Sequence, residues 1–83
     1  YATTAINLTL TSAHHWVKVT AACTQTLPTA VGITGREYII SATAAGVIVD
    51  GDGTETINGY ASWTMSANST MQIKSDGANW III

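Results

Sequence analysis

The sequence has few of the features that usually stabilise a small protein. It contains one cysteine, Cys23, so no disulfide can form within the chain, and no Cys/His spacing is typical of a structural zinc site. Only 10% of the 83 residues are charged and 47% are hydrophobic, against about 25% charged in a typical soluble domain. The length allows one domain, residues 1–83, with a marginal core of its own. Oligomerisation is therefore the expected route to stability.

The scarcity of charge also argues against some classes of partner. The net charge is −2, whereas nucleic-acid binding needs clustered basic residues. Lys18, Arg36 and Lys74 are far apart in the sequence, so we expect no nucleic-acid partner. No apolar run approaches the roughly 20 residues that span a bilayer, and we expect no membrane insertion. The chain starts at Tyr1 without an initiator methionine, which leaves open whether it is a fragment of a longer polypeptide.

Phenylalanine is absent, proline occurs once, and no stretch shows the apolar spacing of a helix. The 14 threonines and 10 isoleucines favour strands instead. Alternation with period two and the turn residues predict strands at 5–10, 16–20, 24–27, 37–42, 47–50, 55–57, 62–65, 70–75 and 80–83. In the first of these strands Ile6, Leu8 and Leu10 should share one buried face, and in the second Val17 and Val19 should point inward.

The connections between these strands predict the architecture. Residues 43–46 have the length of a hairpin loop and contain Gly46, so the strands at 37–42 and 47–50 should pair as a hairpin. Eight or nine short strands with frequent turns are typical of a sandwich or barrel. We predict an all-β fold, a compact antiparallel β-sandwich resembling a jelly roll, with a strand-exchanged β-prism as the alternative. The sequence has no internal repeat of fixed period, which argues against a solenoid or propeller.

The aromatic residues are the candidates for recognition, because exposed rings can stack on sugars while their polar edges bond to hydroxyl groups. Trp16 and Tyr60 lie on the polar side of a strand or beside a turn, and with Trp63 they form the predicted recognition set. A second set is expected in the core or at an oligomer interface, and comprises Tyr38, Ile40, Trp80 and Ile82.

The polar clusters are better explained as turns than as reactive sites. His14-His15 lacks a further ligand at metal-binding spacing. The segment from Asp50 to Glu55 carries three carboxylates, but their spacing does not fit a calcium loop. Neither Cys23 nor these acids stand in a recognisable catalytic motif. We therefore expect no enzymatic activity, no metal and no cofactor.

Four elements occur in an order that resembles a known family. They are Leu27-Pro28, Gly35-Arg36-Glu37-Tyr38-Ile39-Ile40, the turn from Asp50 to Gly59 with Glu55-Thr56-Ile57 inside it, and Ser75-Asp76-Gly77-Ala78-Asn79-Trp80. Residues 24–83 thereby resemble the small β-domain of bacteriophage tail fibres and related virion surface proteins. The segment from Ala13 to Trp16 has no counterpart in that pattern.

The resemblance implies a non-catalytic structural module that forms a trimer on the exterior of a phage particle. The number three comes from the family and not from the residues. Such a module would belong to a tail fibre or spike, or to a head fibre or cement protein that decorates the capsid, with other virion proteins as partners. The alternative is a glycan-binding module that recognises bacterial surface polysaccharide through Trp16, Tyr60 or Trp63.

Overall fold

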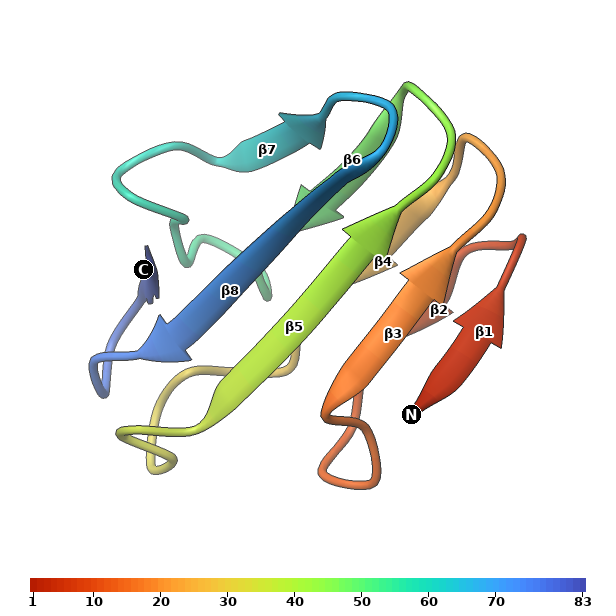
Figure 1. The fold of residues 1–83 in the computed structure, drawn as a ribbon. Helices are drawn as coiled ribbons and strands as arrows, with labels where there is room; N and C mark the ends of the chain where they lie inside the picture. Colours follow the sequence, from red (N-terminus) through yellow and green to blue (C-terminus); the bar gives the residue numbers. More distant parts are fainter.

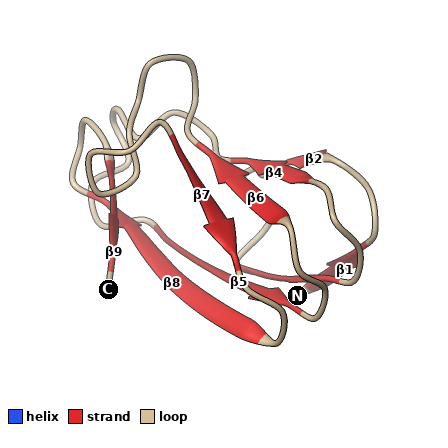
Figure 2. Cartoon of the chain, turned by 90° about the horizontal axis from the view of Figure 1, so that it is seen from above, coloured by secondary structure: helices blue, strands red, loops and turns tan.

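The computed structural model describes all 83 residues and contains strands but no helix (Figure 1). Two mixed sheets pack face to face in two layers (Figure 2), one in the order β1-β3-β5-β8-β9 and the other in the order β2-β4-β6-β7. The strands are β1 (Ala2–Thr4), β2 (Leu8–Thr9), β3 (Trp16–Val19), β4 (Thr24–Thr26), β5 (Glu37–Ala42), β6 (Val47–Asp50), β7 (Ser62–Met65), β8 (Ser69–Ser75) and β9 (Trp80–Ile82). The predicted all-β, sandwich-like class is confirmed.

The first six strands belong alternately to the two sheets, so that the chain winds as a coil. Strands β1, β3 and β5 lie parallel in one sheet, while β2, β4 and β6 lie parallel in the other. The prediction of antiparallel pairing is therefore wrong for this half of the chain, and correct for β5–β8, β6–β7 and β8–β9. The winding resembles a solenoid although the sequence shows no repeat, because successive turns differ in length. Ala2 pairs with Val17, 15 residues later, whereas Val17 pairs with Ile40, 23 residues later.

The hairpin predicted around Gly46 does not form. Strands β5 and β6 follow one another in the chain but belong to opposite sheets, so residues 43–46 bridge the two layers as an arch. Gly46 has a positive φ of 82°, as expected of a tight connection. A hairpin and an arch turn the same alternate residues inward, and the choice depends on which strands occupy the neighbouring positions. Here β3 and β8 take both edges of β5.

Two further strand predictions are corrected. The strand expected over residues 5–10 shrinks to β2, and Ile6 is 71% exposed instead of buried. The additional strand β1 lies before it, because its three residues pair with β3. The segment 55–57 forms only isolated bridges from Ile57 to Tyr60 and to Trp80.

The core lies between the sheets and consists of 15 buried apolar residues. Alternate residues supply it, as the period-two pattern predicted: Val17 and Val19 of β3 are fully buried, as are Val47 and Val49 of β6. Gln25 is the one large polar side chain inside, and its amide nitrogen donates to the carbonyl oxygen of Ile6 at 3.1 Å. The core is thus supplied by alternate residues of short strands in both layers.

Residues of all four motifs from the sequence analysis meet at one end of the sandwich around Trp80. This side chain is fully buried, packs against Tyr38 with ring centroids 5.6 Å apart, and donates its indole N–H to the carbonyl of Pro28 at 3.3 Å. Its backbone amide donates to Thr56, and its carbonyl accepts from Asn58. These contacts give the motif residues a structural role in closing this end of the core.

Candidate functional site

An aromatic pair lies on the outer face of the five-stranded sheet. Trp16 of β3 is 44% exposed, and its ring meets that of Tyr1 edge-on with centroids 4.6 Å apart. The indole N–H donates to Ser41 Oγ on β5 at 3.1 Å, which holds the ring in place. Lys18 and Ser41 are paired beside it. The surface has the form of an aromatic platform with polar neighbours.

The other two predicted recognition residues lie on the opposite sheet. Tyr60 is 61% exposed and packs against the half-buried Trp63 of edge strand β7, with centroids 5.8 Å apart. Because Trp16 belongs to the five-stranded sheet and Trp63 to the four-stranded one, the three aromatic residues do not form one site.

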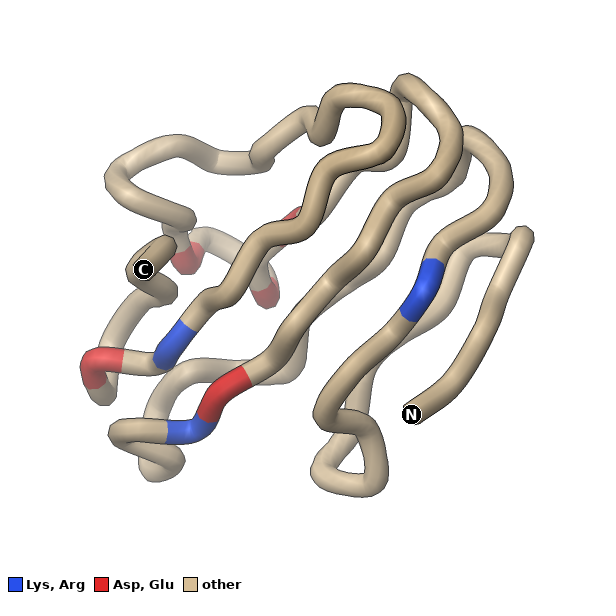
Figure 3. The backbone as a smooth tube through the Cα atoms, viewed as in Figure 1, with Lys and Arg blue, Asp and Glu red and all other residues tan.

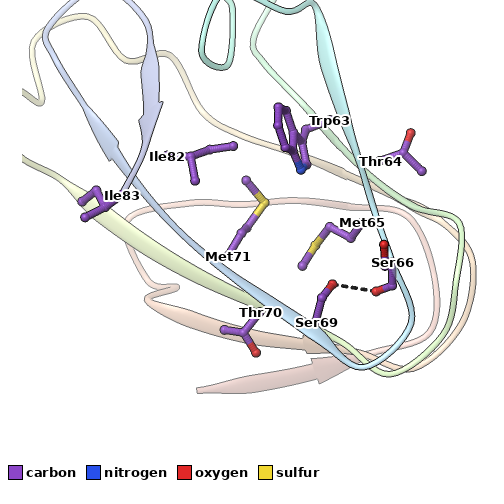
Figure 4. A pocket seen from close by; sticks show the side chains of 9 residues that line it. All are labelled: Trp63, Thr64, Met65, Ser66, Ser69, Thr70, Met71, Ile82 and Ile83. Carbon is purple, nitrogen blue, oxygen red and sulfur yellow. Dashed lines mark hydrogen bonds between the residues drawn. The ribbon is translucent and has the colours of Figure 1, made fainter.

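A groove of about 350 Å³ opens between β7 and the pair β8–β9 (Figure 4). Its apolar wall residues come from β7, from β8 and from the segment of β9, and are Trp63, Met65, Met71, Ile82 and Ile83. The other four lining residues carry hydroxyl groups, and within them Ser69 Oγ donates to the carbonyl of Ser66 at 2.6 Å (Figure 4). No charged side chain lines the groove, and its lining is mixed, with five apolar residues and four that carry hydroxyl groups.

The four edge strands of the two sheets contain neither a charged residue nor a proline. These strands are β1, β2, β7 and β9, and the charges lie on the inner strands or in turns (Figure 3). Soluble proteins usually protect sheet edges with lysine, proline, bulges or short strands. The edge strands of this chain are short, with two to four residues each, but they contain no lysine and no proline.

The histidine pair is held in a turn and does not converge on one point. His14 Nδ1 accepts a hydrogen bond from the backbone N–H of Thr11 at 2.9 Å, whereas His15 Nε2 lies 3.4 Å from Glu37 Oε1. The Arg36 guanidinium donates to the carbonyl of His14 and lies over the ring of Tyr38. This turn is therefore fastened to β5 by structural contacts.

The carboxylates are occupied by separate structural tasks. Glu55 accepts from Thr29 Oγ1 at 2.5 Å and from the backbone N–H of Ala30 at 2.7 Å. Hydrogen bonds from the backbone N–H groups of Asn79 and Ala78 lower the pKa of Asp76 below its usual value. No group of three or more His, Cys, Asp or Glu side chains is arranged to hold a metal ion.

The pKa of Glu37 is lowered, and the largest cause is a hydrogen bond from the Gln72 side chain. The positive charge of Lys74 and hydrogen bonds with Lys74 and His15 lower this pKa further. Lys74 Nζ lies 3.6 Å from Glu37 Oε2, and both residues face outward on neighbouring strands. This group of polar side chains gives the outer face of the five-stranded sheet its only ion pairs.

Of the second predicted set, Tyr38, Ile40 and Trp80 are buried within the single chain. Ile82 is partly buried and lines the groove, so it alone of this set contributes to an accessible surface. Sequence reasoning missed Ile6 and Ile83, which are 71% and 63% exposed. Their exposure follows from their position beside the outermost strands, and the sequence gives no signal of it because it does not show the strand order.

Comparisons with models of known protein families, with curated protein sequences and with solved structures find no match to this chain. The structure also has no helix with the length and hydrophobicity needed to cross a membrane.

Proposed function

We propose that this chain is a non-catalytic structural module of the exterior of a bacteriophage particle and that it works as an oligomer. The observation that carries the oligomer is the absence of charge and proline from all four edge strands. Seven large apolar side chains are exposed, and five of them lie at the two ends of the sheets: Tyr1, Ile6, Tyr60, Ile81 and Ile83. Contact with further copies would remove this apolar surface from water.

The placement on a phage particle, and the number three, follow from the resemblance of residues 24–83 to virion β-domains. The hydrogen bonds of the motif residues around Trp80 are consistent with a scaffold role, because these residues stabilise the core. Tail fibre or spike, and head fibre or cement, are both consistent with such a scaffold. Other virion proteins would then be the partners of the assembled module.

The oligomer is tested by the solution mass of the 83-residue chain, measured by light scattering, and by thermal unfolding at several concentrations. We expect a mass three times the 8.7 kDa of one chain. The unfolding temperature should rise with protein concentration, because association stabilises the folded state. A mass of one chain, with unfolding independent of concentration, would contradict the proposed function.

A second candidate function is recognition of bacterial surface polysaccharide, favoured by the exposed Tyr1–Trp16 platform. The ring of Trp16 is fixed by its bond to Ser41, so stacking on a sugar would cost little side-chain entropy. This role is compatible with an assembled module, since the platform lies on the outer face of a sheet.

Glycan binding is tested on an array of bacterial polysaccharides. Trp16→Ala should abolish any selective binding while the far-ultraviolet circular dichroism spectrum stays unchanged, because the stacking surface is lost and the core is not. Trp16→Phe retains a ring and should keep a measurable part of the binding. Absence of selective binding by the correctly assembled protein would exclude this function.

A further inference from the structure

We propose that Ile6, displayed beside edge strand β2, inserts into the groove between β7 and β9 of a second copy of this chain. The contact joins the two opposite edges of the four-stranded sheet, and is therefore head to tail. This inference rests on the proposed function, because it specifies how the oligomer forms.

Ile6 is an exposed apolar residue whose backbone is held by hydrogen bonds. It is 71% exposed, the largest fraction among the large apolar residues. Its carbonyl accepts from the buried Gln25 amide at 3.1 Å and from Thr4 Oγ1 at 3.2 Å, and its N–H donates to Thr4 Oγ1 at 3.3 Å. Because the backbone is already ordered, burying this side chain against a partner costs little backbone entropy.

The groove is the matching feature at the other end of the same sheet. The five-stranded sheet extends one strand beyond the four-stranded sheet, so β9 has no strand opposite it next to β7. Its walls are also ordered, since the N–H of Ile82 donates to Asn58 Oδ1 at 2.9 Å and that of Ile83 donates to the carbonyl of Gln72 at 2.8 Å. The Ile6 side chain of a second copy, beside its strand β2, would fill this groove.

A second copy fits this groove better than an unrelated partner for two reasons. The projecting residue and the cavity are both present on every copy, and they lie at opposite ends of the sheet, as do the chain termini in Figure 1. No charged side chain lies in β2 or β7 or lines the groove, so this contact would desolvate no charged side chain of these segments. A head-to-tail contact of this kind closes into a ring when the rotation between copies allows it.

The size of the surface is compatible with a specific contact. The two shortest extents of the molecule are 25 and 21 Å, so its smallest face projects roughly 500 Å². Burial of such a face on both partners would reach about 1,000 Å², the area expected of a biological interface. Each copy in a closed ring forms two such contacts, one at each end.

The test uses two variants that damage opposite ends of the contact, Ile6→Glu and Ile83→Glu. Each variant alone should have the mass of a single chain in light scattering, because a carboxylate replaces an apolar group at one side of every junction. A mixture of the two retains one intact junction, between the Ile6 of one variant and the groove of the other. The expected mass of the mixture is therefore that of a one-to-one dimer.

Val31→Glu is the matched control, since Val31 is 62% exposed and does not line the groove. It should keep the mass of the unmodified protein. An oligomeric parent whose mass is unaffected by Ile6→Glu would refute the contact and leave the proposed function standing. Two monomeric variants that fail to combine would also refute it, because the intact Ile6 of one variant and the intact groove of the other would then not bind each other. A monomeric parent would overturn the proposed function together with the contact.

A disulfide trap covers the case in which a glutamate variant does not fold. In a Cys23→Ser background, Ile6→Cys combined with Ile83→Cys should form chains linked between copies under mild oxidation, seen on a non-reducing gel. Val31→Cys combined with Ile83→Cys should remain unlinked. Equal linking of both pairs would speak against a specific junction.

Discussion

Replacement of Trp80 by alanine is expected to lower the free energy of unfolding by about 3–5 kcal/mol, the range for removing a fully buried large aromatic side chain. The indole is 0% exposed, packs against Tyr38, and donates its N–H to the carbonyl of Pro28. Small domains are stable by only about 5–15 kcal/mol in total. Urea unfolding, followed by far-ultraviolet circular dichroism, should therefore show a much lower midpoint at equal protein concentration.

Trp16→Ala provides the matched control, because it removes the same ring from the surface. Its loss should be about 1 kcal/mol or less, reflecting one aromatic contact with Tyr1 and one exposed hydrogen bond with Ser41. Trp80→Phe should fall between the two, since it keeps a ring in the core and loses the bond to Pro28. Similar losses for Trp80→Ala and Trp16→Ala would contradict the structural role assigned to Trp80.

Replacement of Glu55 by alanine is expected to cost about 2–3 kcal/mol, because a hydrogen bond to a charged group contributes about 1.5–3 kcal/mol and an unsatisfied buried amide costs a similar amount. The carboxylate accepts from Thr29 Oγ1 and from the N–H of Ala30. Ala30 is fully buried, so its amide has no ready access to water once the carboxylate is removed. The measurement is the change in free energy from chemical denaturation.

Asp52→Ala, in the same turn, removes a carboxylate that takes no part in these bonds and should change stability by less than about 0.5 kcal/mol. Glu55→Gln retains an acceptor for the amide of Ala30 and should lose less than Glu55→Ala. A loss at Asp52 as large as that at Glu55 would show that the turn depends on its negative charge rather than on the bonds to residues 29 and 30.

The inward-facing residues of the central strands were predictable from the sequence. In β3 and β8 apolar and polar residues alternate, and Val17, Val19, Met71 and Ile73 are buried as that alternation requires. The failure at Ile6 has a physical cause: the alternation of residues 5–10 is the same whether or not the chain is paired there. Only β2, at residues 8–9, finds a partner strand in β4.

The candidate surfaces were less accessible to sequence reasoning. Trp16 was expected at the surface and is exposed, but its partner Tyr1 directly precedes β1, a strand that the pattern did not reveal. The groove brings Met65 of β7 and Met71 of β8 together with Ile83, which follows β9. No local pattern relates these residues, because strand order determines which side chains meet at an edge.

The sequence by itself determined the strand class, most of the residues that face the core, and the shortage of charge. These properties follow from side-chain chemistry and from the two-residue period, both of which act locally. Only the tertiary structure decided that β5 and β6 form an arch, that the first six strands wind as a parallel coil, and that the uncharged strands lie at the edges. Pairing between strands far apart in the chain selects among arrangements that bury the same residues, so long-range packing and not local pattern sets the surfaces available to a partner.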